Sequence, residues 1–241
     1  MNGARHRIDW HESAGERAWI DGAVRSISDA LDASLRGADR TLLLLSGGST
    51  PAPVLRALAF ADTDWSRVVV SLVDERDVPP DDPASNARLV RETLLRERAS
   101  AAMFRPLREG APSLGAAVAD ANRDWHAARL PLAAVVFGMG DDAHTASLFP
   151  GARGLPVALA ADGPYVAFDA HDRAGAGAWP RRITLVPRAW QAAGLRLLLL
   201  RGAGKRAAFE GALAAGDVLA APVLATVDVD GPPLQVHWCA T

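Results

Sequence analysis

Short apolar runs alternate along the chain with longer stretches in which apolar residues recur every three or four positions. Within residues 12–36, for example, Ile20, Val24, Ile27 and Leu31 share one face of a predicted helix. The same periodicity, or a helix-start signal, predicts further helices that begin near positions 51, 85, 114, 187 and 204.

Apolar runs that are too short for helices predict buried strands. They occupy residues 41–45, 68–73, 103–107, 133–137, 165–168, 183–186, 195–200 and 234–238, the last expected at a sheet edge. Strands that alternate with helices indicate an α/β fold: an open, mainly parallel twisted sheet with helices on both faces, Rossmann-like and joined by right-handed crossovers. Because no repeat or low-complexity linker interrupts residues 1–241, we expect a single domain.

Composition and charge narrow the class of protein. A hydrophobic share of 49% and a net charge of −2 are those of an ordinary globular protein, and they give no electrostatic footprint for nucleic acid or an anionic membrane. The first residues lack the apolar core of a signal peptide, and no apolar run approaches the ~20 residues of a membrane span. A single cysteine, Cys239, suits a reducing compartment. We therefore expect a cytoplasmic protein without nucleic-acid or membrane partners.

A glycine-rich turn follows the first buried strand. Ser46, Gly47, Gly48, Ser49 and Thr50 offer backbone N–H groups and hydroxyls immediately before a helix, which suits a phosphate. The alternative is a tight strand-to-helix turn with a capping hydroxyl. The spacing is not that of a Walker loop.

Other charged residues also stand at predicted strand ends. Asp74 and Arg76 follow residues 68–73, Arg182 precedes residues 183–186, and Lys205 follows residues 195–200. Each has an ordinary alternative, either a carboxylate–arginine pair between loops or a solvated lysine. Together with the glycine-rich turn, however, they predict an anion pocket at one sheet edge.

The loop after residues 133–137 contains Asp142 and His144, a carboxylate two residues before a histidine. This pair indicates general acid–base chemistry near neutral pH, and the alternative is a histidine that caps a turn. Thr145 and Ser147 are expected to open a short helix. A lone Asp-x-His without further histidines or cysteines is weak support for zinc, so we expect no metal.

The same loop formally fits the dinucleotide-binding pattern, with Gly138, Gly140 and Ala143 at its key positions. Two aspartates and no basic residue would place negative charge where a pyrophosphate should bind. Pro150 and Gly151 would also cut short the helix that this pattern requires. We therefore reject a nicotinamide nucleotide as the ligand.

Four motifs between about residues 42 and 213 together resemble one known family: SGGSTP, DERDVPPDDPASN, GMGDDAHTASLFPG and RGAGKR. The chain resembles the 6-phosphogluconolactonases, which are grouped with the glucosamine-6-phosphate deaminase/isomerases. The TASLFP segment looks like the lactonase version of its loop. The resemblance implies an open α/β sheet and hydrolysis of 6-phospho-D-glucono-1,5-lactone to 6-phosphogluconate, in the oxidative pentose phosphate pathway.

The resemblance also implies roles for residues. His144 would be the general base and Asp142 its partner, with no metal or other cofactor and a phosphorylated sugar lactone as the small-molecule partner. The positions expected to line the sugar-phosphate pocket are Ser46, Gly47, Gly48, Ser49, Thr50, Asp74, Arg76, Arg182 and Lys205, with Asn86 at its rim. The family usually has glycine where this chain has Ala143, which adds strain if that position requires a positive φ.

Some alternatives stay open at this point. The chain could be a sugar-phosphate isomerase or deaminase of the same fold, or a sugar-phosphate-binding protein without catalysis; the lack of a basic stretch counts against a DNA-binding regulator. A monomer or a small homo-oligomer fits the sequence equally well.

Overall fold

A computed structural model describes residues 7–227 and 231–241. Residues 1–6 and 228–230 lie outside the described ranges. The first of these belongs to the N-terminal stretch that we expect not to be a signal peptide. A seven-stranded sheet has the order β1-β10-β9-β6-β2-β3-β5, and every neighbouring pair in it is parallel. Its strands are β1 (Ile8–Ser13), β2 (Thr41–Leu45), β3 (Val68–Leu72), β5 (Met103–Phe104), β6 (Leu132–Phe137), β9 (Leu195–Arg201) and β10 (Leu234–Cys239).

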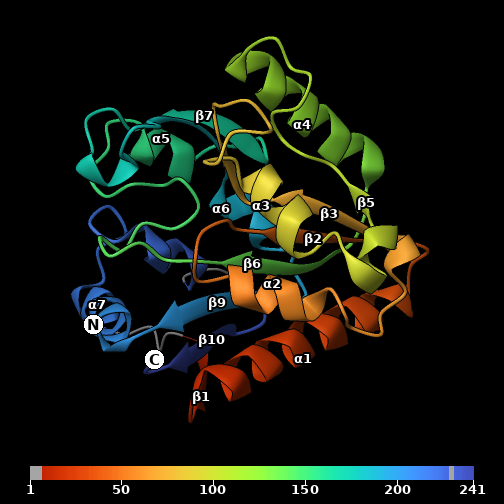
Figure 1. Ribbon diagram of the computed structural model, residues 1–241. Helices are drawn as coiled ribbons and strands as arrows, with labels where there is room; N and C mark the ends of the chain where they lie inside the picture. Colours follow the sequence, from red (N-terminus) through yellow and green to blue (C-terminus); the bar gives the residue numbers. More distant parts are fainter. Residues whose placement is uncertain (1–6, 228–230) are drawn as a thin grey trace.

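Helices flank this sheet on both faces, as predicted (Figure 1). The α-helices are α1 (Glu16–Leu35), α2 (Ala52–Leu58), α3 (Asn86–Thr93), α4 (Leu114–Ala128), α5 (Leu155–Leu159), α6 (Pro187–Trp190) and α7 (Ala203–Ala215). Short 3-10 turns are η1 (Trp65–Arg67), η2 (Glu97–Ala101), η3 (Ala174–Ala176) and η4 (Pro222–Thr226). In Figure 1, α1 and α2 lie below the sheet and α4 above it.

The apolar periodicity seen in the sequence accounts for the core. Helix α1 buries Trp19, Ala23, Ile27 and Leu31 completely, and it packs across several strands of the parallel sheet. All residues of β6 are buried, as expected of a central strand covered on both faces. Each large apolar side chain buried in this way contributes roughly 1.5–3 kcal/mol, so this packing fixes the strands whose ends form the site.

A second, antiparallel sheet lies beside the parallel one and was not predicted. It has the order β4-β8-β7, with β4 (Asp74–Arg76), β7 (Tyr165–Asp169) and β8 (Arg181–Leu185). The sequence indicated strands at 165–168 and 183–186, but antiparallel strands need only a loop between them, so their direction was not evident from helix alternation. The register places Arg76 opposite Arg182, which brings two predicted site residues together.

Three expectations for single elements were wrong. The half-exposed, polar strand β1 was missed, so the first helix begins at Glu16 rather than near residue 12. Because β1 pairs with β10, residues 234–238 form an inner strand and not an edge. Residues 145–148 form a turn and not the expected short helix, because Thr145 bridges to Leu148 and the Ser147 N–H donates to the Thr184 hydroxyl.

The buried imidazole of His237 on β10 predicts a pH-dependent stability. It stacks on His11 with ring centroids 4.4 Å apart, and its Nε2 lies 3.2 Å from the Ser26 hydroxyl. Burial is the main reason why the pKa of His237 falls from 6.5 to about 4; the charges of His11 and Arg25 lower it further, and Asp9 opposes the shift. Between these two pH values the unfolded chain binds a proton that the folded chain excludes, so stability falls as the pH drops from about 6.5 to 4.

We expect His237 to contribute about 3 kcal/mol to this loss. Urea unfolding of the parent protein and of His237→Gln at several pH values measures the effect, because the difference between the two curves removes the contribution of the carboxylates. Parallel curves from pH 7 down to 4 would contradict the prediction.

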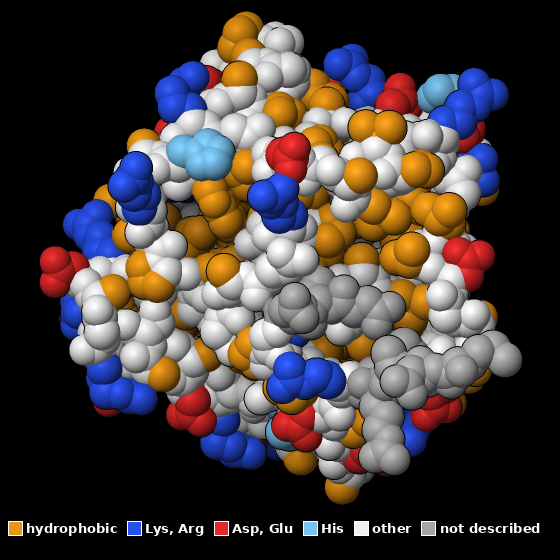
Figure 2. Space-filling model, turned by 180° about the vertical axis from the view of Figure 1, so that it is seen from behind, with side chains coloured by type: hydrophobic (Ala, Val, Ile, Leu, Met, Phe, Trp, Pro, Cys, Tyr) orange, Lys and Arg blue, Asp and Glu red, His pale blue; other side chains and the backbone are white. Residues whose placement is uncertain are grey.

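Charged side chains of both signs are interspersed over the face shown in Figure 2, with apolar surface between them. This agrees with the sequence, whose net charge of −2 gives no electrostatic footprint for nucleic acid or an anionic membrane. Of the helices in the described ranges, none combines the length and hydropathy needed to cross a bilayer.

Candidate active site

The predicted site residues come together around one cavity of about 190 Å³. Its walls are formed by residues 46–51, residues 138–140 and side chains from the ends of β4, β8 and the start of α3 and α7. Every predicted site residue except Asp142 lines it, and Asp142 contacts His144, which does. Another cavity, of about 360 Å³ between α4 and β2–β3, contains none of these residues.

Asp142 and His144 form a hydrogen-bonded pair at the cavity wall. His144 Nδ1 lies 2.5 Å from Asp142 Oδ1, and the same oxygen accepts the backbone N–H of His144 at 3.2 Å. Burial disfavours ionisation of Asp142, but the hydrogen bonds and charge of His144 together outweigh it and hold the pKa of this carboxyl below its usual range. With Nδ1 engaged, Nε2 is the nitrogen that can accept a proton from a ligand.

Two close packing contacts fix the orientation of the His144 ring. Its centroid lies 4.4 Å from that of Phe149. A Cβ on Gly140 would lie only 2.1 Å from His144 Nδ1 and 2.6 Å from Asp142 Oδ1, so this position must be glycine for the pair to form.

The glycine-rich turn is shaped by Asn86 of α3. A Cβ on Gly47 would lie 1.9 Å from Asn86 Oδ1, and Gly48 has a φ of +104°, so both positions require glycine. Asn86 Nδ2 in turn donates to the Asp74 backbone carbonyl at 2.8 Å. The buried Ser46 hydroxyl has no protein partner within the described residues, which leaves it available to a ligand in the cavity.

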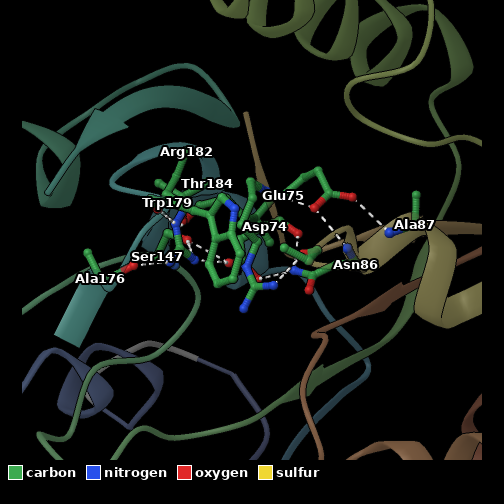
Figure 3. A network of polar contacts seen from close by, with 12 residues as sticks. Asp74, Glu75, Asn86, Ala87, Ser147, Ala176, Trp179, Arg182 and Thr184 are labelled. Carbon is green, nitrogen blue, oxygen red and sulfur yellow. Dashed lines mark hydrogen bonds and ion pairs between the residues drawn. The ribbon is translucent and has the colours of Figure 1, made fainter. Parts of the chain in front are cut away.

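A buried polar network holds Asp74 at the base of the site (Figure 3). Ser147 Oγ donates to Asp74 Oδ2 at 2.5 Å, and Arg182 Nη1 lies 3.8 Å from the same oxygen. Burial lowers the pKa of Arg182, while the charge of Asp74 opposes that shift. Ser147, expected to open a helix, is therefore a member of the site that the sequence did not reveal.

Glu75 is a second residue that the sequence did not assign to the site. It is 1% exposed, and its carboxyl accepts the N–H groups of Arg76, Asn86 and Ala87 and the Ser85 hydroxyl at 2.7–3.0 Å. Burial raises the pKa of Glu75, and these hydrogen bonds oppose the rise. Glu75 thus fixes the start of α3 and the Asn86 side chain that supports the glycine-rich turn. Nothing in the local sequence separates it from an ordinary strand-end carboxylate.

Two cationic groups face the cavity with unused donors. Arg76 donates to the Ala84 carbonyl, and its buried Nε has no partner in the described part of the chain. Lys205 Nζ donates to the Met139 carbonyl at 2.5 Å and lies 3.0 Å from Asp141, which leaves it one further N–H. Lys205 can therefore receive an anion without breaking a contact, and Arg76 adds positive charge at the cavity wall.

Metal-binding side chains do not cluster here. Across residues 7–227 and 231–241, no group of three or more His, Cys, Asp or Glu side chains is arranged to hold a metal ion. That the protein acts without a metal stays a prediction.

Comparison with known proteins identifies the family. The family described as "Glucosamine-6-phosphate isomerases/6-phosphogluconolactonase" matches residues 14–235. The chain belongs to this family. It is 46% identical over 222 residues to a 6-phosphogluconolactonase from Xylella fastidiosa, with 92% of each chain covered, and 39% identical over 223 residues to one from Rhizobium meliloti, with 92% and 94% covered.

Solved structures of family members have the same fold. The crystal structure of a 6-phosphogluconolactonase from Shewanella baltica superposes with a TM-score of 0.88 at 33% identity, covering 96% of this chain and 97% of that one. A putative 6-phosphogluconolactonase from Neisseria gonorrhoeae gives a TM-score of 0.85 at 30% identity, with 95% and 98% covered.

The residue between Asp142 and His144 adopts the strained conformation that the sequence left open. Ala143 has a φ of +62°, in the left-handed region that favours glycine. Hydrogen bonds on both sides stabilise it, because its N–H donates to the Gly140 carbonyl and its carbonyl accepts the Val223 N–H, each at 3.1 Å. The Asp142–His144 contact forms nonetheless, so the alanine does not disrupt the pair.

Replacing Ala143 with glycine is expected to stabilise the protein by up to about 1 kcal/mol, because it removes the left-handed strain but also a buried methyl group. We expect the kcat of lactone hydrolysis to change less than about twofold, since the Asp142–His144 pair is already in place. Thermal unfolding and steady-state kinetics test both statements. The matched control is Ala158→Gly inside α5, where loss of helix propensity should destabilise by about 1 kcal/mol. A tenfold rise in kcat for Ala143→Gly would contradict our interpretation.

Proposed function

We propose that this protein hydrolyses 6-phospho-D-glucono-1,5-lactone to 6-phospho-D-gluconate in the oxidative pentose phosphate pathway. The names of its relatives, at up to 46% identity over most of the chain, support the substrate. The observation that carries the proposal is the Asp142–His144 pair on the wall of a cavity that also holds cationic groups. We further propose that it works as one cytoplasmic domain, since its single cysteine suits a reducing compartment.

The chemistry needs a base and no covalent nucleophile, because a lactone is an activated ester. His144 Nε2 takes a proton from the water that attacks the C1 carbonyl, while Asp142 stabilises the imidazolium and fixes its orientation. The imidazolium then gives its proton to the departing ring oxygen, and the product is a carboxylic acid that ionises in water. Backbone N–H groups of Gly47 and Gly48 are suited to stabilise the intermediate oxyanion.

The phosphate positions the lactone for this attack. We assign it to Arg76 and Lys205, whose donors are partly unused, with Ser46, Ser49 and Thr50 as hydroxyl partners. Charge-assisted hydrogen bonds to a phosphate far from C1 convert binding energy into orientation of the carbonyl. Arg182 lines the same cavity, but most of its donors already have protein partners.

The test is acid release from freshly made phosphorylated lactone at a pH near 7, corrected for spontaneous opening in buffer. We expect clear acceleration with the phosphorylated lactone and a much lower kcat/KM with unphosphorylated glucono-1,5-lactone, because the cationic groups then have no partner. Equal rates with and without protein would refute the proposal. Ammonia release from glucosamine 6-phosphate would instead favour an isomerase or deaminase.

A further inference from the structure

A glycine in the loop between β7 and β8 lies directly against the Asp142 carboxylate. A Cβ on Gly175, within η3, would be 2.5 Å from Asp142 Oδ2 and 3.6 Å from a ring carbon of Phe149. Gly175 is not among the residues with a positive φ, so its backbone could accommodate alanine. Only the contact with Asp142 excludes a side chain here.

Arg182 holds this loop in place from β8. Its Nε donates to the Trp179 carbonyl at 2.5 Å and its Nη2 to the Ala176 carbonyl at 3.1 Å, on the C-terminal side of Gly175. Nη1 donates to Ser147 Oγ at 3.3 Å (Figure 3). The side chain is 6% exposed, so these contacts are largely shielded from water.

Phe149 contacts both Arg182 and the Asp142–His144 pair. The Arg182 guanidinium lies 5.4 Å from the centre of the Phe149 ring, and the His144 ring packs against the same phenylalanine, tilted by 32° with centroids 4.4 Å apart. The Asp142 carboxylate, although 39% exposed, has Oδ1 against Gly140 and Oδ2 against Gly175.

We propose that Arg182 and Gly175 are positioning residues for the Asp142–His144 pair: Arg182 clamps the loop so that the Gly175 backbone keeps the Asp142 carboxylate against His144 Nδ1. This differs from the phosphate-binding role that the family resemblance implied for Arg182. The proposal rests on the proposed function, because it expects loss of Arg182 to lower the kcat of lactone hydrolysis. Phosphate binding is then left to Arg76 and Lys205.

Two substitutions test the clamp. Gly175→Ala should push Asp142 away and lower kcat at least about tenfold with KM changed less than about threefold, since small displacements of catalytic groups carry large kinetic costs. Arg182→Lys should have the same effect, because one ammonium cannot reach both carbonyls. Lys205→Met should chiefly raise KM. The matched control is Ala178→Gly, an exposed position in the same loop, which should match the parent protein.

The double variant Gly175→Ala/Arg182→Lys should lose little more activity than the more impaired single variant, because both changes displace the same Asp142 carboxylate from His144. A raised KM with unchanged kcat in Arg182→Lys would make Arg182 a phosphate ligand and overturn the proposal. Unchanged kinetics in Gly175→Ala would overturn it as well.

A readout without substrate separates this proposal from the proposed function. The proton between His144 Nδ1 and Asp142 should give a downfield NMR signal in the parent protein and in Ala178→Gly, and it should be lost in Gly175→Ala. If the parent protein does not hydrolyse the lactone but the signal behaves in this way, the proposed function fails and the clamp stands. A signal that persists in Gly175→Ala refutes the clamp whether or not the lactone is hydrolysed.

Discussion

Replacing His144 with alanine is expected to lower kcat for the phosphorylated lactone by about 10²–10⁴-fold, with KM changed less than about threefold. The substitution removes the only group proposed to take the proton from water, while the cationic groups at the other parts of the cavity stay in place. Initial rates of acid release at a pH near 7, over a range of lactone concentrations, separate kcat from KM. The rate of spontaneous lactone opening in buffer must be subtracted, because it limits the lowest enzymatic rate that can be measured.

The chain provides a matched control for this substitution. Asp169, Ala170 and His171 repeat the Asp-Ala-His sequence of the site, and His171 Nδ1 lies 3.0 Å from Asp169 Oδ1. The His171 side chain is 68% exposed and does not line the cavity, whereas that of His144 is 26% exposed. His171→Ala should therefore keep the parent kcat. If both variants lose activity equally, or neither does, His144 is not the base.

These two Asp-Ala-His segments show what the sequence can and cannot predict. Their local geometry is alike, because in both an aspartate oxygen bonds to the Nδ1 of the histidine two residues later. Only one follows a buried parallel strand, β6, whose carboxyl end faces the cavity. The placement of the site could be predicted from apolar runs, since parallel strands bring their carboxyl ends to one edge.

The parts that could not be predicted depend on antiparallel pairing and on buried polar contacts. Arg181 and Arg182 are adjacent in the sequence, yet the first is exposed at the start of β8 and pairs with Asp77, while the second is buried with the rest of the strand. Nothing in the sequence therefore predicts that Arg182 contacts the loop beside Asp142. The polar strand β1 was missed for a similar reason, because its residues lack an apolar run and are ordered by pairing with β10.

Replacing Glu75 with leucine is expected to reduce the free energy of unfolding by roughly 3–5 kcal/mol, which is a large part of the stability of a typical domain. The carboxyl satisfies three backbone N–H groups and one hydroxyl, and a leucine leaves all four buried without an acceptor. Glu75→Gln keeps one acceptor oxygen but turns an NH₂ group toward donors, so it should lose about half as much.

Urea denaturation measures both losses. The control for Glu75→Leu is Glu92→Leu in α3, the helix whose start receives no support from the Glu92 side chain. Glu92 is exposed, and among the described residues its carboxylate pairs only with Arg88, four residues earlier, so its loss should cost less than about 0.5 kcal/mol. Glu75→Gln should also raise the KM for the lactone, because the start of α3 carries Asn86, which supports the glycine-rich turn. Equal destabilisation by the two leucine substitutions would show that the buried carboxyl does not hold this end of α3, and the turn would then owe its shape to the backbone of residues 46–51 alone.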